Sequence, residues 1–302
     1  MRLNLFRSTP PAEWKVPVAR RMRELEIVTA RLVRAGFAGQ YHSAIHGRGV
    51  EFSQVREYQP GDDIRTIDWN VTARSGVPHV KEFVEERDLS ILLALDVSGS
   101  MSFGSVDRRK IDLAVEIASV LAFSALENGD RVGLALVGDG VTRMIPPRRG
   151  RVHTQAVIHT ALGASRAAAG KSDLEKAAGF LSRALRKRTI IILLSDFLGD
   201  GGYSLALRRL AVRHDVIAVR LSDPREAHLP RQGIVTLVDA ESGDARTIDL
   251  RSRDSARAAA ALRGASDQAL TSSGVDFVDV STAIPYERAL VRFFERRSGR
   301  RR

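Results

Sequence analysis

The chain has 302 residues, of which 44% are hydrophobic, and it carries a formal net charge of +11. This length and apolar content suffice for one large or two modest folded domains and exclude a disordered chain. The absence of cysteine excludes disulfides, thiolate metal sites and cysteine nucleophiles, and it fits a reducing compartment. No apolar run approaches the roughly 18 residues that a membrane span needs, and residues 1–20 lack the apolar core of a signal peptide. We therefore expect a cytoplasmic protein without a transmembrane segment.

The positive charge is compatible with binding to nucleic acid or to an acidic partner, but its distribution favours neither strongly. Five arginines crowd the C-terminus: Arg296, Arg297, Arg300, Arg301 and Arg302. The other arginines are scattered through predicted helices that also carry acidic residues. We predict a solvated, solubilising tail, and we keep a nucleic-acid binder that uses this tail as an alternative function.

The N-terminal part begins with an amphipathic pattern. Apolar residues recur every three or four positions over residues 16–35, which predicts a helix that ends at Gly36 and packs against the main domain. His42 and His46 follow at a spacing that could share one helix face and bind a metal. No third ligand lies nearby in the sequence, so ordinary polar surface is the better interpretation.

Residues 49–74 combine a turn at Pro60 and Gly61 with alternating charges around Trp69. The charged residues are Arg56, Glu57, Asp62, Asp63, Arg65, Asp68 and Arg74. Short extended segments are expected here, followed by a strand over 77–86. A hydrogen-bonded clamp that joins two parts of the fold explains such a pattern best; a catalytic pocket and a partner-docking surface are the alternatives.

From residue 89 onward, apolar runs typical of buried strands alternate with helical patterns. Strands are expected over 90–96, 131–137, 141–145, 189–196, 215–221 and 276–280, with a hairpin over 234–250. Helices are expected over 111–125, 153–164, 173–186, 205–214, 253–271 and 285–297. This alternation predicts an α/β fold: a mainly parallel sheet flanked by helices, with an N-terminal helix-and-strand extension.

Two of the buried strands end in an aspartate, Asp96 and Asp196. Ser98 and Ser100 follow Asp96 at alternate positions, and Ser172 precedes a helix whose start is on the same edge of the sheet. Such an all-oxygen set suits Mg²⁺ or Mn²⁺ rather than zinc. The predicted metal ligands are Asp96, Ser98, Ser100, Ser172 and Asp196, some of them acting through water.

The charge of this site favours docking over catalysis. Two carboxylates only neutralise a divalent ion, so an open coordination position would attract an acidic side chain of a partner protein. No histidine lies close in sequence to these loops, and Ser98 stands where an aspartyl phosphatase has a second aspartate. We expect no catalytic residues, and we keep a metal-dependent phosphohydrolase as an alternative. Capping of helices or turns by Asp96 and Asp196 is the purely structural explanation.

The sequence from Asp96 to Ser100 resembles the metal-ion-dependent adhesion site of von Willebrand factor A domains. The stretch from Gly49 to Arg74 resembles the signature of the bacterial family called domain of unknown function 58, and the resemblance covers residues 36–221. It implies a von Willebrand A or Rossmann-like fold, and Ser172 stands where A domains usually have threonine. It also implies an adaptor for a MoxR-type AAA+ ATPase in protein or complex maturation.

The domain organisation that follows has two parts. Residues 1–88 form an N-terminal extension that carries the family signature. Residues 89–302 form the von Willebrand A-like domain, with a C-terminal hairpin and helices. The predicted function is a non-catalytic, Mg²⁺-dependent protein-interaction module.

Overall fold

We describe a computed structural model of the chain, which covers residues 18–34, 41, 50–85, 89–199, 201–227, 233–238 and 244–300. The predictions for Gly36, His42, His46, Arg301 and Arg302 lie outside these residues. Within them, no helix is long and apolar enough to cross a membrane.

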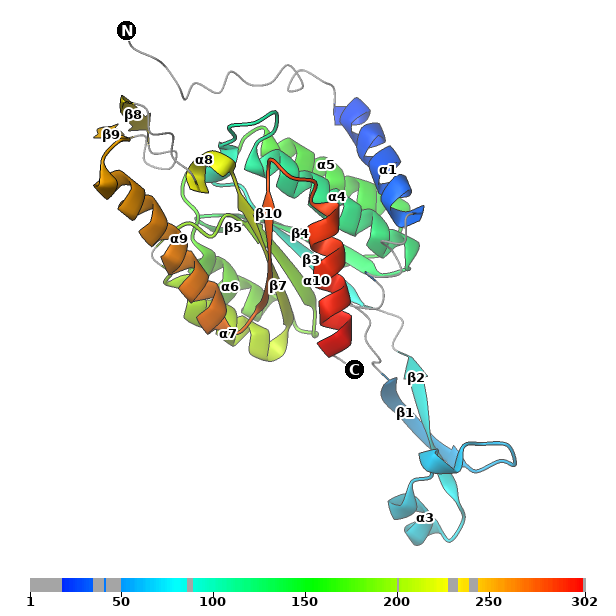
Figure 1. The fold of residues 1–302 in the computed structure, drawn as a ribbon. Helices are drawn as coiled ribbons and strands as arrows, with labels where there is room; N and C mark the ends of the chain where they lie inside the picture. Colours follow the sequence, from blue (N-terminus) through cyan, green and yellow to red (C-terminus); the bar gives the residue numbers. More distant parts are fainter. Residues whose placement is uncertain are drawn as a thin grey trace.

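A six-stranded sheet forms the centre of the α/β domain, in the spatial order β10-β7-β6-β3-β4-β5 (Figure 1). The strands are β3 (Ser90–Asp96), β4 (Arg131–Gly138), β5 (Gly140–Arg148), β6 (Ile190–Ser195), β7 (Asp215–Ser222) and β10 (Asp276–Ser281). All neighbouring pairs are parallel except β4 and β5. The predicted fold class is therefore confirmed. Prolines 146 and 147 are accommodated because β5 is an edge strand.

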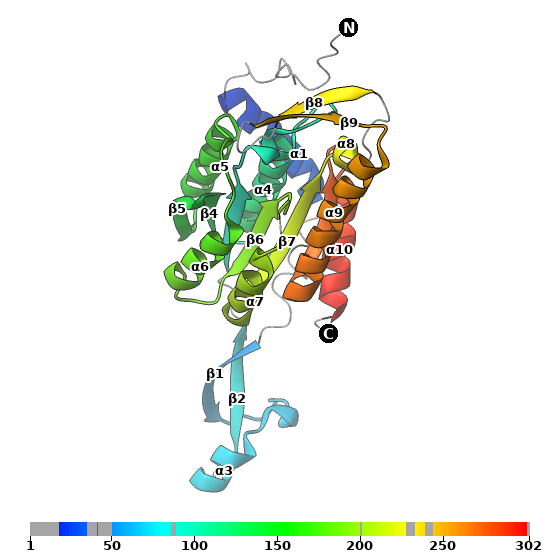
Figure 2. The same cartoon turned by 90° about the vertical axis from the view of Figure 1, so that its left-hand side faces the viewer.

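Helices cover both faces of this sheet (Figures 1 and 2). One face carries α4 (Lys110–Glu127), α5 (Arg151–Ser165) and α10 (Glu287–Arg300), and α1 (Val18–Arg34) packs on α4 and α5 as expected. The other face carries α6 (Leu174–Ala184), α7 (Tyr203–Arg213) and α9 (Arg253–Ser273). A four-residue helix, α8 (Pro224–Ala227), follows β7, and a small hairpin of β8 (Ile234–Val238) and β9 (Ala245–Asp249) follows α8.

The burial of β3 on both faces explains its continuous apolar sequence. Leu93 and Leu95 belong to the core on the α4 side, whereas Leu92 and Ala94 belong to the core on the α6 side. Successive side chains of a strand point to opposite faces, so a strand covered by helices on both sides needs apolar residues throughout. This strand carries its last residue, Asp96, to the carboxyl edge of the sheet.

Residues 50–85 form an arm that projects from the other edge of the α/β domain (Figures 1 and 2). It consists of the antiparallel strands β1 (Val50–Glu57) and β2 (His79–Glu85), a short 3₁₀ turn η2 (Ile64–Thr66) and the helix α3 (Trp69–Ser75). The prediction of short extended segments is corrected at α3. This helix begins because the Asp68 carboxylate accepts hydrogen bonds from the backbone N–H groups of Asn70 and Val71.

Among the described residues, charged side chains of the arm bind partners within the arm itself. Arg56 donates two hydrogen bonds to the Asp62 carboxylate, with N···O distances of 2.7 and 2.8 Å. Asp62 also accepts a bond from the backbone N–H of Gln59, and Asp63 accepts one from Arg65. The predicted clamp is therefore real but local, because it fixes the turn between β1 and α3 within the arm.

The C-terminal arginines do not all form a solvated tail. Arg297 is buried between α10 and the sheet, where it donates hydrogen bonds to Asp215 and Asp276. A buried guanidinium needs carboxylate partners, and the two aspartates at the starts of β7 and β10 supply them. The prediction is corrected for Arg297, which ties the last helix to two strands.

Candidate functional site

The predicted site lies where the strand order reverses. Counted along the chain, the strands of the sheet stand in the order 3-2-1-4-5-6, so β3 and β6 flank the switch point. Ligands of open α/β sheets bind beyond the carboxyl ends of the strands at this point, because the loops there diverge to opposite faces. Asp96 is the last residue of β3, and Asp196 directly follows β6. The topology therefore places both residues where ligands bind in sheets of this type.

Asp96 is a buried carboxylate that accepts hydrogen bonds from two loops and from the last residue of β6. Its Oδ1 accepts a bond from the backbone N–H of Ser98 at 2.9 Å. Its Oδ2 accepts bonds from the hydroxyls of Ser172 at 3.1 Å and Ser195 at 2.6 Å. Burial, reinforced by the negative charge of Asp196, raises the pKa of Asp96 above its usual value, although the hydrogen bonds oppose this shift.

The loop that carries Ser172 is held against the loop after β3 by the backbone. Gly99 donates to the carbonyl of Gly170 at 2.9 Å, and Ala169 donates to the carbonyl of Val97 at 3.0 Å. Asp173 then caps α6, as predicted, by accepting a bond from the N–H of Lys176. These bonds bring residues that are 76 positions apart in the sequence into contact at Asp96.

The two serines after Asp96 complete the hydroxyl set. The Ser98 and Ser100 hydroxyl oxygens lie 3.1 Å apart. Ser98 is buried, whereas Ser100 and Ser172 are partly exposed, so the cluster opens to solvent on the side of those two hydroxyls. Among the described residues, no three His, Cys, Asp or Glu side chains are arranged to hold a metal ion, so a cation here would depend on serine oxygens as well as carboxylates.

Asp196 has a partner that the sequence analysis did not predict. Its Oδ2 accepts a bond from the ammonium group of Lys110 at 2.7 Å, and the same ammonium group donates to Glu226 in α8. The Lys110 side chain is fully buried. Burial alone would lower the pKa of Lys110, but the charges and hydrogen bonds of Asp196 and Glu226 raise it above its usual value. The lysine is therefore a fixed internal cation beside the site.

Two signals in the sequence point to these missed residues. Lys110 occupies the first turn of α4, where a positive charge opposes the helix dipole, so such a lysine suggests a tertiary carboxylate partner. Ser195 directly precedes Asp196, and adjacent strand residues point in opposite directions. Only one of the two side chains could therefore face Asp96 directly, and the structure gives that contact to Ser195.

The backbone after Asp196 adopts a left-handed conformation. Phe197 has a φ of 53°, the only positive φ among the described non-glycine residues, and its side chain is fully buried. The Phe197 N–H donates to the Ser195 hydroxyl, and the Phe197 carbonyl accepts a bond from the Tyr203 hydroxyl. Such strain persists only where the surroundings enforce it, and it is concentrated at functional sites.

One carboxylate links the loop after β3 to the far edge of the sheet. Asp223, at the end of β7, accepts bonds from the backbone N–H and hydroxyl of Ser105 and from the hydroxyl of Thr282, which follows β10. It also begins α8, since its carboxylate accepts a bond from the N–H of Arg225. Glu226 and the loop after β3 are thereby anchored to the same residue.

The five predicted ligands thus form two groups: four of them lie together around Asp96, and Asp196 stands apart. Asp96 contacts Ser172 directly, and the Ser98 and Ser100 hydroxyls contact each other in the loop after Asp96. Asp196 bonds to Lys110 instead of any of these four, although its charge is close enough to shift the pKa of Asp96. Both Asp196 oxygens already accept a hydrogen bond, Oδ2 from Lys110 and Oδ1 from the Leu198 N–H at 3.2 Å, so a cation between the groups would meet an engaged carboxylate.

Comparison with known proteins gives a family for this chain. The uncharacterized protein Rv1480 of Mycobacterium tuberculosis is 36% identical over 280 residues, which are 91% of this chain and 88% of that protein. The crystal structure of the conserved hypothetical protein BatB from Bacteroides thetaiotaomicron aligns with 70% of this chain and 99% of its own, at 15% identity and a TM-score of 0.47. The SpRpn10 VWA domain aligns with 69% of this chain and 94% of its own, at 12% identity and a TM-score of 0.37.

The two structural scores are low, so the description of the fold rests on the strand order above. The family rests on sequence: residues 54–269, well over half of the chain, match the family described as Protein of unknown function DUF58. This match spans most of the arm and the carboxyl ends of both β3 and β6. The chain is therefore a member of the DUF58 family, and its α/β domain is built on a mostly parallel six-stranded sheet.

Proposed function

We propose that this protein is a non-catalytic, Mg²⁺-dependent interaction module whose ion is held at the carboxyl edge of β3 and β6. The observation that carries the proposal is the buried Asp96 carboxylate, which gathers the Ser172 and Ser195 hydroxyls and lies beside a second carboxylate, Asp196. Two neighbouring carboxylates and several hydroxyls form the hard oxygen environment that Mg²⁺ and Mn²⁺ prefer.

The charges around the site also fit a divalent cation. Asp96, Asp196 and Glu226 supply three carboxylates, whereas Lys110 supplies one ammonium group, which sits on the side of Asp196 and Glu226. The partners of Asp96 among the described residues are therefore hydroxyls and a backbone N–H group, and none of them is a cation. Burial of a carboxylate without a counter-charge is costly, and an ion beside Asp96 would remove that cost.

Asp96, Ser98, Ser100 and Ser172 would hold the ion, and Asp196 would act through water because Lys110 occupies its Oδ2. The bound ion would supply an electrophilic centre for an acidic side chain of the partner. The partly exposed Ser100 and Ser172 mark the side from which that side chain would approach. The partner we propose is a MoxR-type AAA+ ATPase, on the resemblance of residues 36–221 to proteins associated with such ATPases.

A role in binding is favoured over hydrolysis by the side chains around Asp96. The described histidines are His79, His153, His159 and His214. None of these four forms a hydrogen bond with Asp96, Asp196 or the site serines in the described part of the chain. A metal-dependent hydrolase normally places a general base or nucleophile beside its ion. The acids that are present are engaged by serines or by Lys110.

Calorimetric titration with Mg²⁺ tests the site. We expect saturable binding to the wild-type protein and none to Asp96→Asn, a variant that preserves side-chain shape. Asp139→Asn is the matched control, because Asp139 is an exposed aspartate on the neighbouring β4–β5 turn. Circular dichroism establishes that each variant is folded. Equal Mg²⁺ affinities of the wild-type protein and Asp96→Asn would contradict the assignment.

The partner is tested separately from the ion. Binding of a MoxR-type ATPase from the source genome should be measurable by biolayer interferometry in Mg²⁺ and lost in EDTA or with Asp96→Asn. Mg²⁺ binding in calorimetry without any ATPase binding would retain the metal site and reject this partner.

A further inference from the structure

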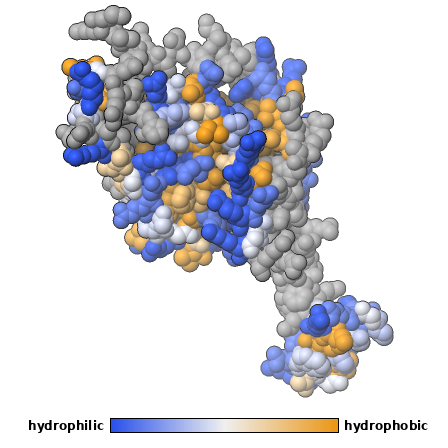
Figure 3. Space-filling model, in the orientation of Figure 1, coloured by the Kyte–Doolittle hydropathy of each residue, from blue (hydrophilic) through white to orange (hydrophobic). Residues whose placement is uncertain are grey.

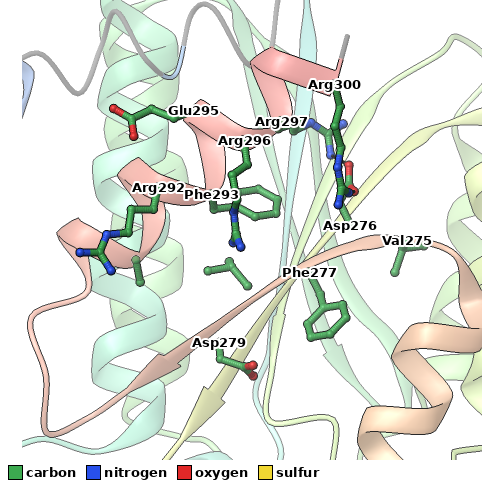
Figure 4. Close-up of a pocket in the computed structure, with 12 residues that line it drawn as sticks. Val275, Asp276, Phe277, Asp279, Arg292, Phe293, Glu295, Arg296, Arg297 and Arg300 are labelled. Carbon is green, nitrogen blue, oxygen red and sulfur yellow. Dashed lines mark hydrogen bonds and ion pairs between the residues drawn. The ribbon is translucent and has the colours of Figure 1, made fainter.

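A second surface lies at the free edge of the sheet, away from Asp96. β10 ends the strand order and pairs only with β7 among the described strands, so its outer edge presents unpaired backbone groups. A cavity of about 710 Å³ runs along this edge between β10 and α10 (Figure 4). Five consecutive residues, 275–279, line it, which is a length of about 16 Å in an extended strand.

The opposite wall of this cavity is basic. Arg292, Arg296 and Arg300 of α10 line it and are exposed. Arg296 extends from α10 toward β10 beside the Phe293 ring (Figure 4). Arg300 reaches Asp276 at 3.5 Å, but Arg292 and Arg296 have no carboxylate partner within 4.0 Å among the described residues. The groove therefore combines an open strand edge with two arginines that lack a carboxylate partner among the described residues, although Asp279 and Glu295 also line it.

The floor of the groove offers some apolar surface. Phe277 is partly exposed, and Phe293 also lines the cavity. Figure 3, drawn in the orientation of Figure 1, shows hydrophobic surface in the middle of this face next to strongly hydrophilic residues. An extended chain that pairs with β10 would place alternate side chains toward α10 and toward α9.

We propose that an extended acidic segment of a partner protein binds along β10 as an additional strand of the sheet. Main-chain hydrogen bonds to the strand edge provide affinity in this mode, and side-chain pockets provide specificity. The arginines of α10 select carboxylate side chains on the bound segment. A second copy of this chain fits poorly, because pairing of two β10 edges brings two arginine-rich α10 helices together.

The probe is the fluorescent heptapeptide Glu-Val-Glu-Val-Glu-Val-Glu, measured by fluorescence anisotropy with the full chain in EDTA. EDTA removes any contribution from the proposed Mg²⁺ site, so the two proposals fail independently. We expect saturable binding that weakens as salt rises. We expect no binding of a peptide with lysine in place of glutamate. A peptide whose central valine is replaced by proline should also fail, because proline cannot donate to the strand edge.

Charge reversal on α10 locates the peptide. The double variant Arg292→Glu with Arg296→Glu should bind about tenfold more weakly or worse, which corresponds to about 1.4 kcal/mol. Arg183→Glu, on an exposed position of α6, is the matched control and should bind like the wild-type protein. Hydrogen exchange with bound peptide should protect the amides of residues 276–281.

Three results would overturn the proposal. The first is equal binding by the α10 variant and the Arg183→Glu control. The second is protection confined to the loop after β3 or to the arm. The third is light scattering that shows a dimer whose formation excludes the peptide, which would assign the edge to a second copy of the chain.

Discussion

The α/β domain and the arm use different physical means to hold their shape. In the α/β domain, helices bury both faces of the central strands, and some charged groups, such as Lys110 and Asp96, are buried as well. In the arm, Val80 alone is buried among the side chains that the structure describes, while Ile64 and Trp69 are 68% and 70% exposed. The α/β domain is stabilised mainly by burial, whereas the arm depends on local hydrogen bonds and leaves apolar side chains free for contact.

The arm and the proposed metal site also lie at opposite ends of the sheet. The chain passes from β2 to the start of β3, and Asp96 is the last residue of β3 (Figures 1 and 2). A partner that reaches both must therefore extend along the domain. If burial stabilises the α/β domain and local hydrogen bonds stabilise the arm, substitutions in the two regions should differ in their effect on stability.

Lys110→Met should destabilise the protein by about 4 kcal/mol, because it leaves the buried Asp196 and the partly exposed Glu226 without their cation. The free energy of unfolding from urea titration measures this loss. Lys176→Met is the matched control, since Lys176 pairs with Asp139 and Asp173 at the surface and should change stability little. Similar losses for both lysines would show that burial does not distinguish the two ion pairs.

Leu93→Ala should cost about 3 kcal/mol, because it opens a cavity in the core beneath α4. Val77→Ala in the arm should stay within about 0.5 kcal/mol, since this side chain is 44% exposed. Urea titrations of the two variants provide the comparison. A loss at Val77 that approaches the loss at Leu93 would mean that the arm packs against another part of the molecule.

Asp68→Ala should loosen the arm by about 1 kcal/mol, because α3 loses its N-cap. The expected readout is amide exchange about fivefold faster in residues 70–75, with unchanged exchange in β3 and β6. Faster exchange throughout the α/β domain would contradict the independence of the two regions.

The smallest effect concerns acid. Hydrogen bonds from Arg56 and from the Gln59 N–H lower the pKa of Asp62 to about 2. Because this pKa lies below the unfolded value of about 3.9, the contribution of Asp62 to stability is present above pH 4. It is lost as the pH falls through about 2. An NMR titration of the Asp62 carboxyl carbon measures this, and Arg56→Ala should raise the pKa toward its ordinary value.

Much of the α/β domain follows from its sequence. The apolar runs at 90–96 and 189–196 and the helical patterns between them predict the parallel sheet, because strands buried on both faces leave a strong signal. The same reasoning predicts the contact of Ser172 with Asp96, since both lie at the carboxyl edge. The proposed binding of a metal by these residues stays a prediction.

The missed features depend on contacts between distant residues. Lys110 and Glu226 are 116 positions apart, and no local sequence pattern predicts their ion pair. The burial of Arg297 likewise depends on Asp215 and Asp276, which come from two strands. The helix α3 escaped prediction because its seven residues are too few to show helical periodicity, although Asp68 is a good N-cap.

The hydrogen bonds of Asp223 have a mechanical consequence. Because one side chain holds both Ser105 and Thr282, a shift of the segment after β3 must either drag the end of β10 with it or break a bond. Binding of an acidic segment along β10 and binding of an ion at Asp96 would then be energetically coupled. Filling either position should change the affinity of the other by the same factor.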